Sequence, residues 1–222
     1  MKIIKVLAGG VTVLVVIGVF GLVGRWDWGR GWALIGLLIT SRIISVPYLW
    51  RKNPELMKRR GQFGEGTKPW DIVVLVPFGP TFLAIPIVAA LDIRYGWSAM
   101  SLWLWPVGAV LYAGFVGMIT WSMAVNPFFE KTVRIQRDRN HQVIESGPYG
   151  IVRHPGYTAT LFGLILAMPL LLGSWWAFIP AMLATLCLIV RTALEDRTLQ
   201  QELSGYDTYT RKVRYRLIPG LW

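Results

Sequence analysis

The chain has 222 residues, of which 54% are hydrophobic and 16% are charged, and its mean hydropathy is +0.48. Soluble domains carry about 25% charged residues, so this composition excludes a disordered chain and an ordinary soluble domain and is typical of a protein embedded in lipid. Lys and Arg number 23 and Asp and Glu 12, which gives a net charge of +11. We expect this charge to lie in basic loops that face anionic membrane lipids, and we expect no nucleic-acid partner.

Six apolar runs predict six transmembrane helices, because each span needs about 20 apolar residues. The first four spans are expected at residues 3–23, 31–50, 71–91 and 97–125. No small-residue cleavage motif follows the first run, which favours an uncleaved span over a signal peptide. The third run contains Pro77, Pro80 and Pro86, which predict a kinked or broken helix.

Residues 157–190 are expected to form a tight helical hairpin divided at Gly173-Ser174. Its first arm, 158–172, is short. The second arm starts near Trp175 and continues past the membrane to Leu203, with Gly205 as the C′ residue that ends it. We therefore expect one all-α membrane domain over 1–222, with four spans in 1–125 and a second half, 126–222, that contains the hairpin.

The loop charges predict an orientation. With the N-terminus inside, 19 of the 23 Lys and Arg residues fall in inner segments and 3 in outer segments. This is a strong positive-inside bias, so both termini are predicted to be cytoplasmic.

Polar residues gather in two segments on the predicted cytoplasmic side, 126–157 and 191–222. Because the hairpin leads out and back, its two ends return to one face, and Arg153-His154-Pro155 is expected beside Glu195-Asp196. Pro155 suits a first helical turn and His154 an N-cap, where free N–H groups favour an anionic ligand group.

The side chains at this face predict a nucleotide-like cofactor pocket. Glu195 and Asp196 suit an amine, a ribose hydroxyl or a sulfonium, and Tyr149 and Tyr157 suit an adenine ring or a cation. The residues alone do not identify which cofactor is bound. The single cysteine, Cys187, and the few histidines give no reason to expect a metal site.

The ordered motifs resemble the isoprenylcysteine carboxyl methyltransferase family, in particular its prokaryotic branch, and more distantly the phospholipid N-methyltransferases. The resemblance covers about residues 126–222. The motifs are Glu145-Ser-Gly-Pro-Tyr149, Val152-Arg-His-Pro-Gly-Tyr157, Arg191-x-x-x-Glu195-Asp196-x-x-Leu199, Gly205-Tyr-x-x-Tyr209 and Tyr215-Arg-Leu-Ile-Pro219. The resemblance implies a small helical membrane enzyme that uses S-adenosylmethionine in a cytoplasmic pocket and methylates a lipophilic small molecule or lipid that enters from the bilayer.

The resemblance also implies roles for individual residues. Cofactor binding is expected at Gly147, Pro148, Tyr149, His154, Pro155, Tyr157, Glu195 and Asp196, and catalysis or acceptor positioning at Arg153, Arg191 and Glu195. Two positions depart from the family pattern. Ala159 stands where glycine is usual and Asp196 where a second glutamate is common, and both departures bear on which acceptor is used.

Other interpretations stay open at this point. Membrane sterol reductases carry a similar Arg-His-Pro turn and use NADPH, and a non-catalytic lipid-binding protein is a third class. Taken alone, Glu195 with Arg191 is more simply a structural pair on a helix surface, and Tyr206, Tyr209 and Tyr215 are expected to be interfacial anchors. Carboxyl O-methylation is the favoured reaction, while the acceptor and the oligomeric state stay open.

Overall fold

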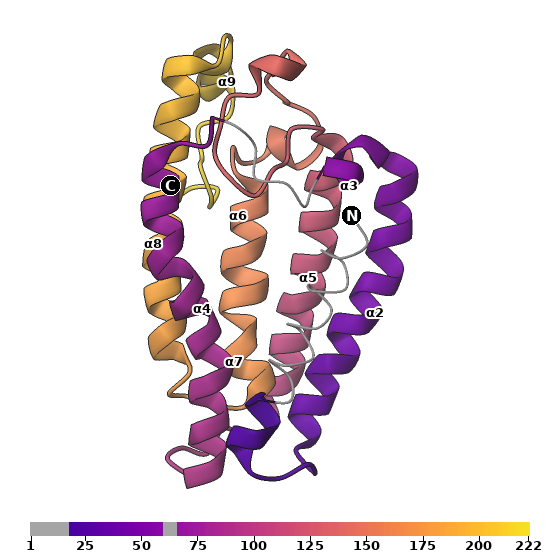
Figure 1. Cartoon of the computed structure of the whole chain (residues 1–222), viewed down its shortest axis with the longest axis vertical. Helices are drawn as coiled ribbons and strands as arrows, with labels where there is room; N and C mark the ends of the chain where they lie inside the picture. Colours follow the sequence, from indigo (N-terminus) through magenta and orange to yellow (C-terminus); the bar gives the residue numbers. More distant parts are fainter. Residues whose placement is uncertain (1–17, 60–65) are drawn as a thin grey trace.

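The computed structural model describes residues 18–59 and 66–222, and this part of the chain contains helices and no strand. Figure 1 shows a bundle of long helices with shorter ones gathered at one end. The long helices are α2 (Gly29–Lys52), α4 (Pro69–Tyr95), α5 (Leu104–Val125) and α8 (Phe178–Glu202), together with one run made of α6 (Pro155–Ala159), the π-helix η3 (Thr160–Ile165) and α7 (Ala167–Leu172). The short elements are α3 (Pro54–Arg59), η1 (Arg137–Arg139), η2 (Gly147–Gly150) and α9 (Tyr206–Lys212).

Five helices in the described residues are long and apolar enough to cross a membrane: α2, α4, α5, the run Pro155–Leu172, and α8. Large apolar side chains such as Val73, Val110 and Met182 are at least 65% exposed on the outer surface of the bundle, as lipid contact would require. Of the further span expected at 3–23, residues 18–23 are helical, and residues 1–17 lie outside the described residues.

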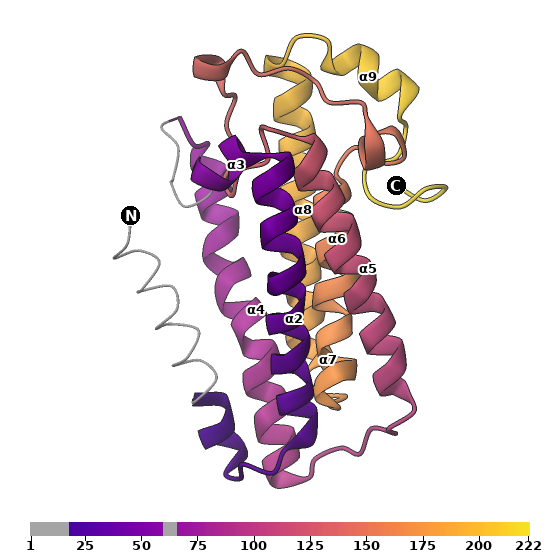
Figure 2. The same ribbon diagram turned by 90° about the vertical axis from the view of Figure 1, so that its right-hand side faces the viewer.

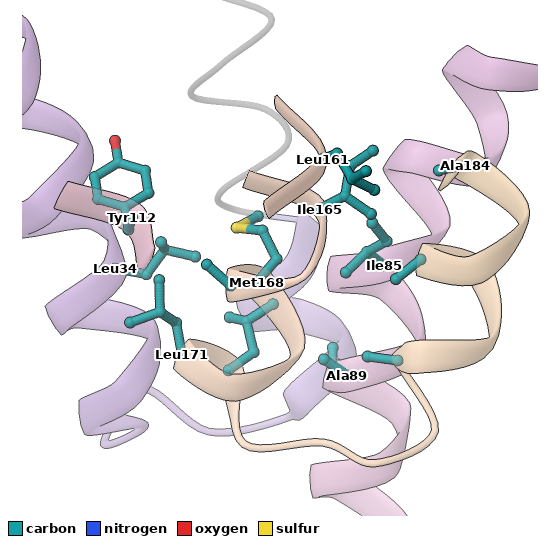
Figure 3. Packing of buried hydrophobic residues seen from close by; sticks show 14 of the residues in the cluster. Leu34, Ile85, Ala89, Tyr112, Leu161, Ile165, Met168, Leu171 and Ala184 are labelled. Atoms are coloured by element: carbon teal, nitrogen blue, oxygen red, sulfur yellow. The ribbon is translucent and has the colours of Figure 1, made fainter. Parts of the chain in front are cut away.

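The run Pro155–Leu172 forms the centre of the bundle. In its most apolar window 61% of the residues are buried, against 11–33% in the other four spans. Figure 3 shows Ile165, Met168 and Leu171 of this run facing Leu34 and Tyr112 on one side and Ile85 and Ala184 on the other. Its neighbours are α5 along one side and α8 and α4 along the other, and α4 packs along α8.

Glycines set the close packing between α5 and the central run. A Cβ placed on Gly163 would lie 2.1 Å from the Cβ atom of Phe115 and 2.6 Å from the Leu111 carbonyl oxygen. A Cβ on Gly108 would lie 2.9 Å from the Cβ atom of Leu170. The two helices therefore touch backbone to side chain at positions where only glycine fits, as small residues allow in membrane bundles.

The central run also contains a wide turn. The Leu166 N–H donates to the Leu161 carbonyl oxygen at 3.1 Å, five residues back, which is the spacing of a π-helix. Such turns occur as single insertions within α-helices and are frequent near functional sites.

Of the two alternatives for the third run, a kinked or a broken helix, the structure contradicts the break: α4 runs without interruption through Pro77, Pro80 and Pro86. Two predicted helix limits are corrected. The span expected at 97–125 becomes helical only at Leu104. Gly205 has the left-handed φ of 84° but stands before α9, because α8 already ends at Glu202.

The late start of α5 has a clear cause at the end of the bundle that is opposite to α9. Asp92 is fully buried and accepts hydrogen bonds from the backbone N–H and the hydroxyl of Ser98 at 2.7 and 2.6 Å. The Ser174 hydroxyl donates to the same carboxylate at 2.5 Å. This cluster holds the chain after α4 in a non-helical turn and fixes it to the turn after Gly173, whose φ is 81°.

Candidate functional site

A pocket lies at the end of the bundle that carries α9. Figures 1 and 2 show α3 and α9 at this same end. The walls come from the segment 126–144, the start of the central run, α8 and α9. Six of the predicted site residues line it: Tyr149, Arg153, His154, Pro155, Tyr157 and Glu195.

The expected proximity of the two motifs is confirmed. His154 is the N-cap residue of α6 and Pro155 stands in its first turn. The His154 Nε2 atom lies 3.2 Å from Asp196 Oδ1, and the Tyr157 hydroxyl donates to Glu195 Oε2. Two segments separated by about 40 residues therefore meet at one end of the bundle, as the out-and-back course of the chain predicts.

Asp196 is the centre of a buried polar network behind the pocket. Its carboxylate is fully buried and accepts two hydrogen bonds from Arg153, at 2.8 and 3.0 Å. Further donors are Tyr206, Gln200 and Arg216, at 3.0, 2.8 and 2.9 Å. With these partners and His154 the carboxylate has no free lone pair for a ligand, and Asp196 does not line the pocket.

The guanidinium of Arg153 is likewise hydrogen-bonded to protein partners. Besides the fork to Asp196, its Nη1 donates to the carbonyl oxygens of Val213 and Arg214 at 3.0 and 2.9 Å, and the side chain is 7% exposed. The geometry therefore does not support the direct acceptor contact that the sequence suggested for Arg153. The guanidinium instead joins α8 to the C-terminal segment.

The C-terminal segment, through residues 215–217, is hydrogen-bonded to the Arg-His-Pro turn. The backbone N–H groups of Arg153 and His154 donate to the carbonyl oxygens of Tyr215 and Arg216 at 2.9 and 3.0 Å. The Thr158 hydroxyl donates to the Leu217 carbonyl oxygen at 2.8 Å. These bonds fix the backbone of residues 215–217 to the Arg-His-Pro turn.

Glu195 is the carboxylate that faces the pocket. In the described residues it accepts the Tyr157 hydroxyl and forms no ion pair within 4 Å. Arg191, one turn earlier on α8, does not pair with it, so the simple helix-surface pair considered from the sequence is absent. The Tyr157 ring is stacked on the His154 ring, with centroids 5.7 Å apart, and together they form a polar, aromatic wall.

Arg191 does not line the pocket but reaches a partner that the sequence did not suggest. Its Nε donates to Asp71 Oδ1 at 2.7 Å and its Nη2 to Asp71 Oδ2 at 3.2 Å. Nη2 also donates to the Lys131 carbonyl oxygen at 2.7 Å, and the guanidinium lies over the Tyr157 ring at 5.3 Å from its centroid. Asp71 is 120 residues away in sequence, so no local pattern indicates this pair.

The Gly147-Pro148-Tyr149 turn supports the pocket from the side of α5. Gly147 has a φ of 61°, and a Cβ there would lie 2.8 Å from Trp121 Nε1, so glycine is required on both grounds. Tyr149 is buried, its hydroxyl accepts from Asn126 at 2.8 Å, and its carbonyl oxygen accepts from Tyr209 at 2.7 Å. Tyr149 lines the pocket, and Gly147 and Pro148 shape the turn that places it.

The structure brings Tyr206 and Tyr209 into the pocket wall, which corrects their assignment as interfacial anchors. They are 4% and 1% exposed. Burial raises the pKa of Tyr206, with a further rise from the charge of Asp196, and burial raises the pKa of Tyr149 and Tyr209. All three phenols are therefore neutral hydrogen-bond donors at physiological pH.

The sequence offered Asn126-Pro127-Phe128 as a possible lining of the cofactor entrance, but sequence reasoning missed Phe129, Glu130 and Arg134. Phe128 and Phe129 line the pocket, and Glu130 and Arg134 form an ion pair at 2.7 Å in its wall. The dipeptide Asn126-Pro127 before them was the available signal: the Asn126 side chain accepts the Phe128 N–H at 2.8 Å and so starts the turn. Within the described residues no group of three or more His, Cys, Asp or Glu is placed to hold a metal ion.

Comparison with known proteins gives two matches. A curated protein of Bacillus subtilis (strain 168), named uncharacterized protein YpbQ, is 24% identical over 173 residues, which are 77% of this chain and 96% of that protein. The model of the Isoprenylcysteine carboxyl methyltransferase (ICMT) family matches residues 110–201. That stretch begins in α5, ends in α8 and includes both pocket motifs. The resemblance to this methyltransferase family is therefore confirmed over residues 110–201, and the motifs at 205–209 and 215–219 lie outside the match.

Proposed function

We propose that the protein is an S-adenosylmethionine-dependent methyltransferase that acts on a lipophilic acceptor, with carboxyl O-methylation as its reaction. The family match supports methyl transfer, and five apolar helices support an acceptor that reaches the pocket from the lipid. The concentration of Lys and Arg in the segments at the α9 end favours a cytoplasmic pocket and cytoplasmic termini.

The choice of S-adenosylmethionine as the methyl donor rests on one observation. Glu195 lines the pocket and forms no ion pair within 4 Å in the described part of the chain, and the guanidinium of Arg191, which acts on it electrostatically, is hydrogen-bonded to Asp71 instead. A carboxylate in such a setting favours a cationic ligand group. S-adenosylmethionine has two such groups, a sulfonium and an ammonium, and aromatic side chains line the same pocket and suit its adenine ring. The residues present therefore fit this donor.

The roles of the residues follow from their contacts. Glu195, Tyr157, His154, Pro155 and Tyr149 are the candidates for contact with the donor, since each lines the pocket. Asp196, Arg153 and Arg191 are positioning residues, because their charged groups are taken up by protein partners. Neither arginine offers a free fork for an acceptor carboxylate.

Methyl transfer requires the protein mainly to position the acceptor and the donor. When bound, the donor supplies an electrophilic methyl group on a positively charged sulfur. The protein aligns the acceptor with it and excludes water, and such alignment contributes roughly 7–11 kcal/mol to rate enhancement. A carboxylate acceptor is already ionised at neutral pH, so the pocket needs no strong base.

The donor assignment is tested by binding to the purified full-length chain in detergent. We expect S-adenosylmethionine and S-adenosylhomocysteine to bind in isothermal titration calorimetry and NADPH not to bind. Glu195→Gln should weaken S-adenosylmethionine at least tenfold, about 1.4 kcal/mol, because a charge-assisted contact is lost. Glu202→Gln is the matched control, on the same helix but in an outer ion pair with Lys68, and should bind like the wild type. NADPH binding without S-adenosylmethionine binding would overturn the assignment.

The reaction is tested with a radiolabelled methyl donor and a membrane lipid extract. Base hydrolysis of the labelled product should release volatile methanol, as expected for a methyl ester. Label that resists base would indicate transfer to nitrogen, as in the phospholipid N-methyltransferases, and would refute carboxyl O-methylation while leaving the donor assignment intact.

A further inference from the structure

Asp71 stands in the first turn of α4, far from both pocket motifs in sequence and outside the residues that match the family model. It is fully buried. An acidic residue in a first helical turn is usually explained by the helix dipole. That explanation does not account for this carboxylate, because both of its oxygens are committed to partners outside α4.

The partners of Asp71 come from two other parts of the chain. Arg191 of α8 donates to both oxygens, at 2.7 and 3.2 Å, and the Val133 N–H donates to Oδ2 at 2.8 Å. Arg191 also donates to the Lys131 carbonyl oxygen at 2.7 Å. One carboxylate therefore fixes α4, α8 and the segment 131–133, of which Thr132 and Val133 line the pocket.

A buried ion pair of this kind is weak support for stability alone, since apolar replacements of similar volume often stabilise a protein as well or better. Its placement indicates another role. The Arg191 guanidinium lies over the face of Tyr157, and the Tyr157 hydroxyl donates to Glu195. The four side chains form a continuous series that begins at α4 and ends at the carboxylate of the pocket.

We propose that Asp71 is a positioning residue of the donor site: it holds the Arg191 guanidinium over Tyr157 and thereby keeps the Tyr157 hydroxyl on Glu195. This inference rests on the proposed function. It adds that the donor site depends on α4, so the first half of the chain takes part in the site and is more than a membrane anchor.

The series from Asp71 through Arg191 to Tyr157 predicts how the effects of two substitutions on donor binding combine. If Asp71 acts through Arg191, removing both should weaken donor binding no more than removing Arg191 alone. If Asp71 acts on the pocket independently, the two effects should multiply. The same logic applies to Tyr157→Phe, which keeps the ring and removes the hydroxyl: Asp71→Asn should have little further effect in that background.

The experiment measures the Kd of S-adenosylhomocysteine for the full-length protein in detergent, on the monodisperse fraction of each variant. Asp71→Asn and Arg191→Gln should each raise the Kd about tenfold, and the double variant should lie within about twofold of Arg191→Gln. Arg191→Lys should not restore binding, because an ammonium lacks the fork that engages Asp71. Glu202→Gln is the control: its ion pair with Lys68, at 2.6 Å, joins α8 to the residue before α4 but lies outside the pocket wall, and its Kd should be unchanged.

The possible results separate the two proposals. No binding to the wild type would refute the proposed function and this inference with it. Wild-type binding with an unchanged Kd in Asp71→Asn, or a double variant about a hundredfold weaker than the wild type, would overturn this inference alone. Asp71→Asn leaves Arg191 buried without its charged partner, and this variant could fail to fold. In that case the double variant, Asp71→Asn with Arg191→Gln, decides. If its Kd equals that of the wild type, the role of Asp71 is refuted.

Discussion

Replacing Asp196 by asparagine tests the network behind the pocket most directly. The change keeps the shape of the side chain and converts one acceptor oxygen into a donor. Each oxygen of Asp196 faces three donor groups: Arg153 Nε, His154 and Tyr206 at Oδ1, and Arg153 Nη2, Gln200 and Arg216 at Oδ2. Whichever way the asparagine amide is turned, its NH₂ group faces at least one arginine N–H, which cannot accept a hydrogen bond and loses its own acceptor.

The expected loss follows from those contacts. A hydrogen bond to a charged group contributes about 1.5–3 kcal/mol, and neighbouring side chains recover part of the loss by relaxing. Breaking a buried ion pair by removing one partner costs about 3–5 kcal/mol, which we take as the expected destabilisation. For a chain of this size each kcal/mol lowers the Tm by about 2–4 °C, so Asp196→Asn should melt roughly 6–20 °C below the wild type.

The assay is thermal unfolding of the purified protein in detergent, followed by intrinsic tryptophan fluorescence. Asp207→Asn is the matched control, because its ion pair with Arg211 is exposed, with side-chain exposures of 65% and 81%; exposed pairs contribute about 0–1 kcal/mol. Its Tm should stay within a few degrees of the wild type. An Asp196→Asn variant that melts with the control would show that the network does not hold the site together.

Three further variants test other parts of the structure by the same thermal assay. Gly163→Ala should destabilise the bundle by at least about 1–3 kcal/mol, because its Cβ would overlap α5, whereas Gly117→Ala, with open space around its Cβ, should be neutral. Tyr206→Phe should cost about 1.5–3 kcal/mol through the lost bond to Asp196; an unchanged Tm would contradict this bond. Burial lowers the pKa of His141 from 6.5 to about 4, so the unfolded chain binds this proton first and stability should fall as the pH drops from about 6.5 to 4. His141→Gln should remove that part of the decline, and parallel curves would refute it.

The sequence predicted the meeting of the two motifs because it follows from chain direction alone. An apolar run that leads out, turns at Gly173 and returns brings Arg153 and Glu195 to one face. Their proximity needed no knowledge of the other helices.

The partners within that face were not predictable in the same way. Glu195 and Asp196 are adjacent in sequence, yet one faces the pocket and the other is buried among six donors, because neighbouring residues on a helix point about 100° apart. The role of Asp71 was missed because an acid at the start of an apolar run has an ordinary local explanation, and its true partner lies on α8. Interactions of this range are determined by packing, which a single sequence does not display.

The π-turn between α6 and α7 has a consequence for how this helix tolerates change. One residue more or fewer in an ordinary helix rotates everything beyond it by about 100°, which would swing Tyr157 away from Glu195 or carry Met168 out of the core. The wide turn at Thr160–Ile165 absorbs the extra residue locally. The two ends of the run therefore keep their orientation, and deleting one residue from this turn should give a regular α-helix while Tyr157 stays beside Glu195 and Met168 stays in the core.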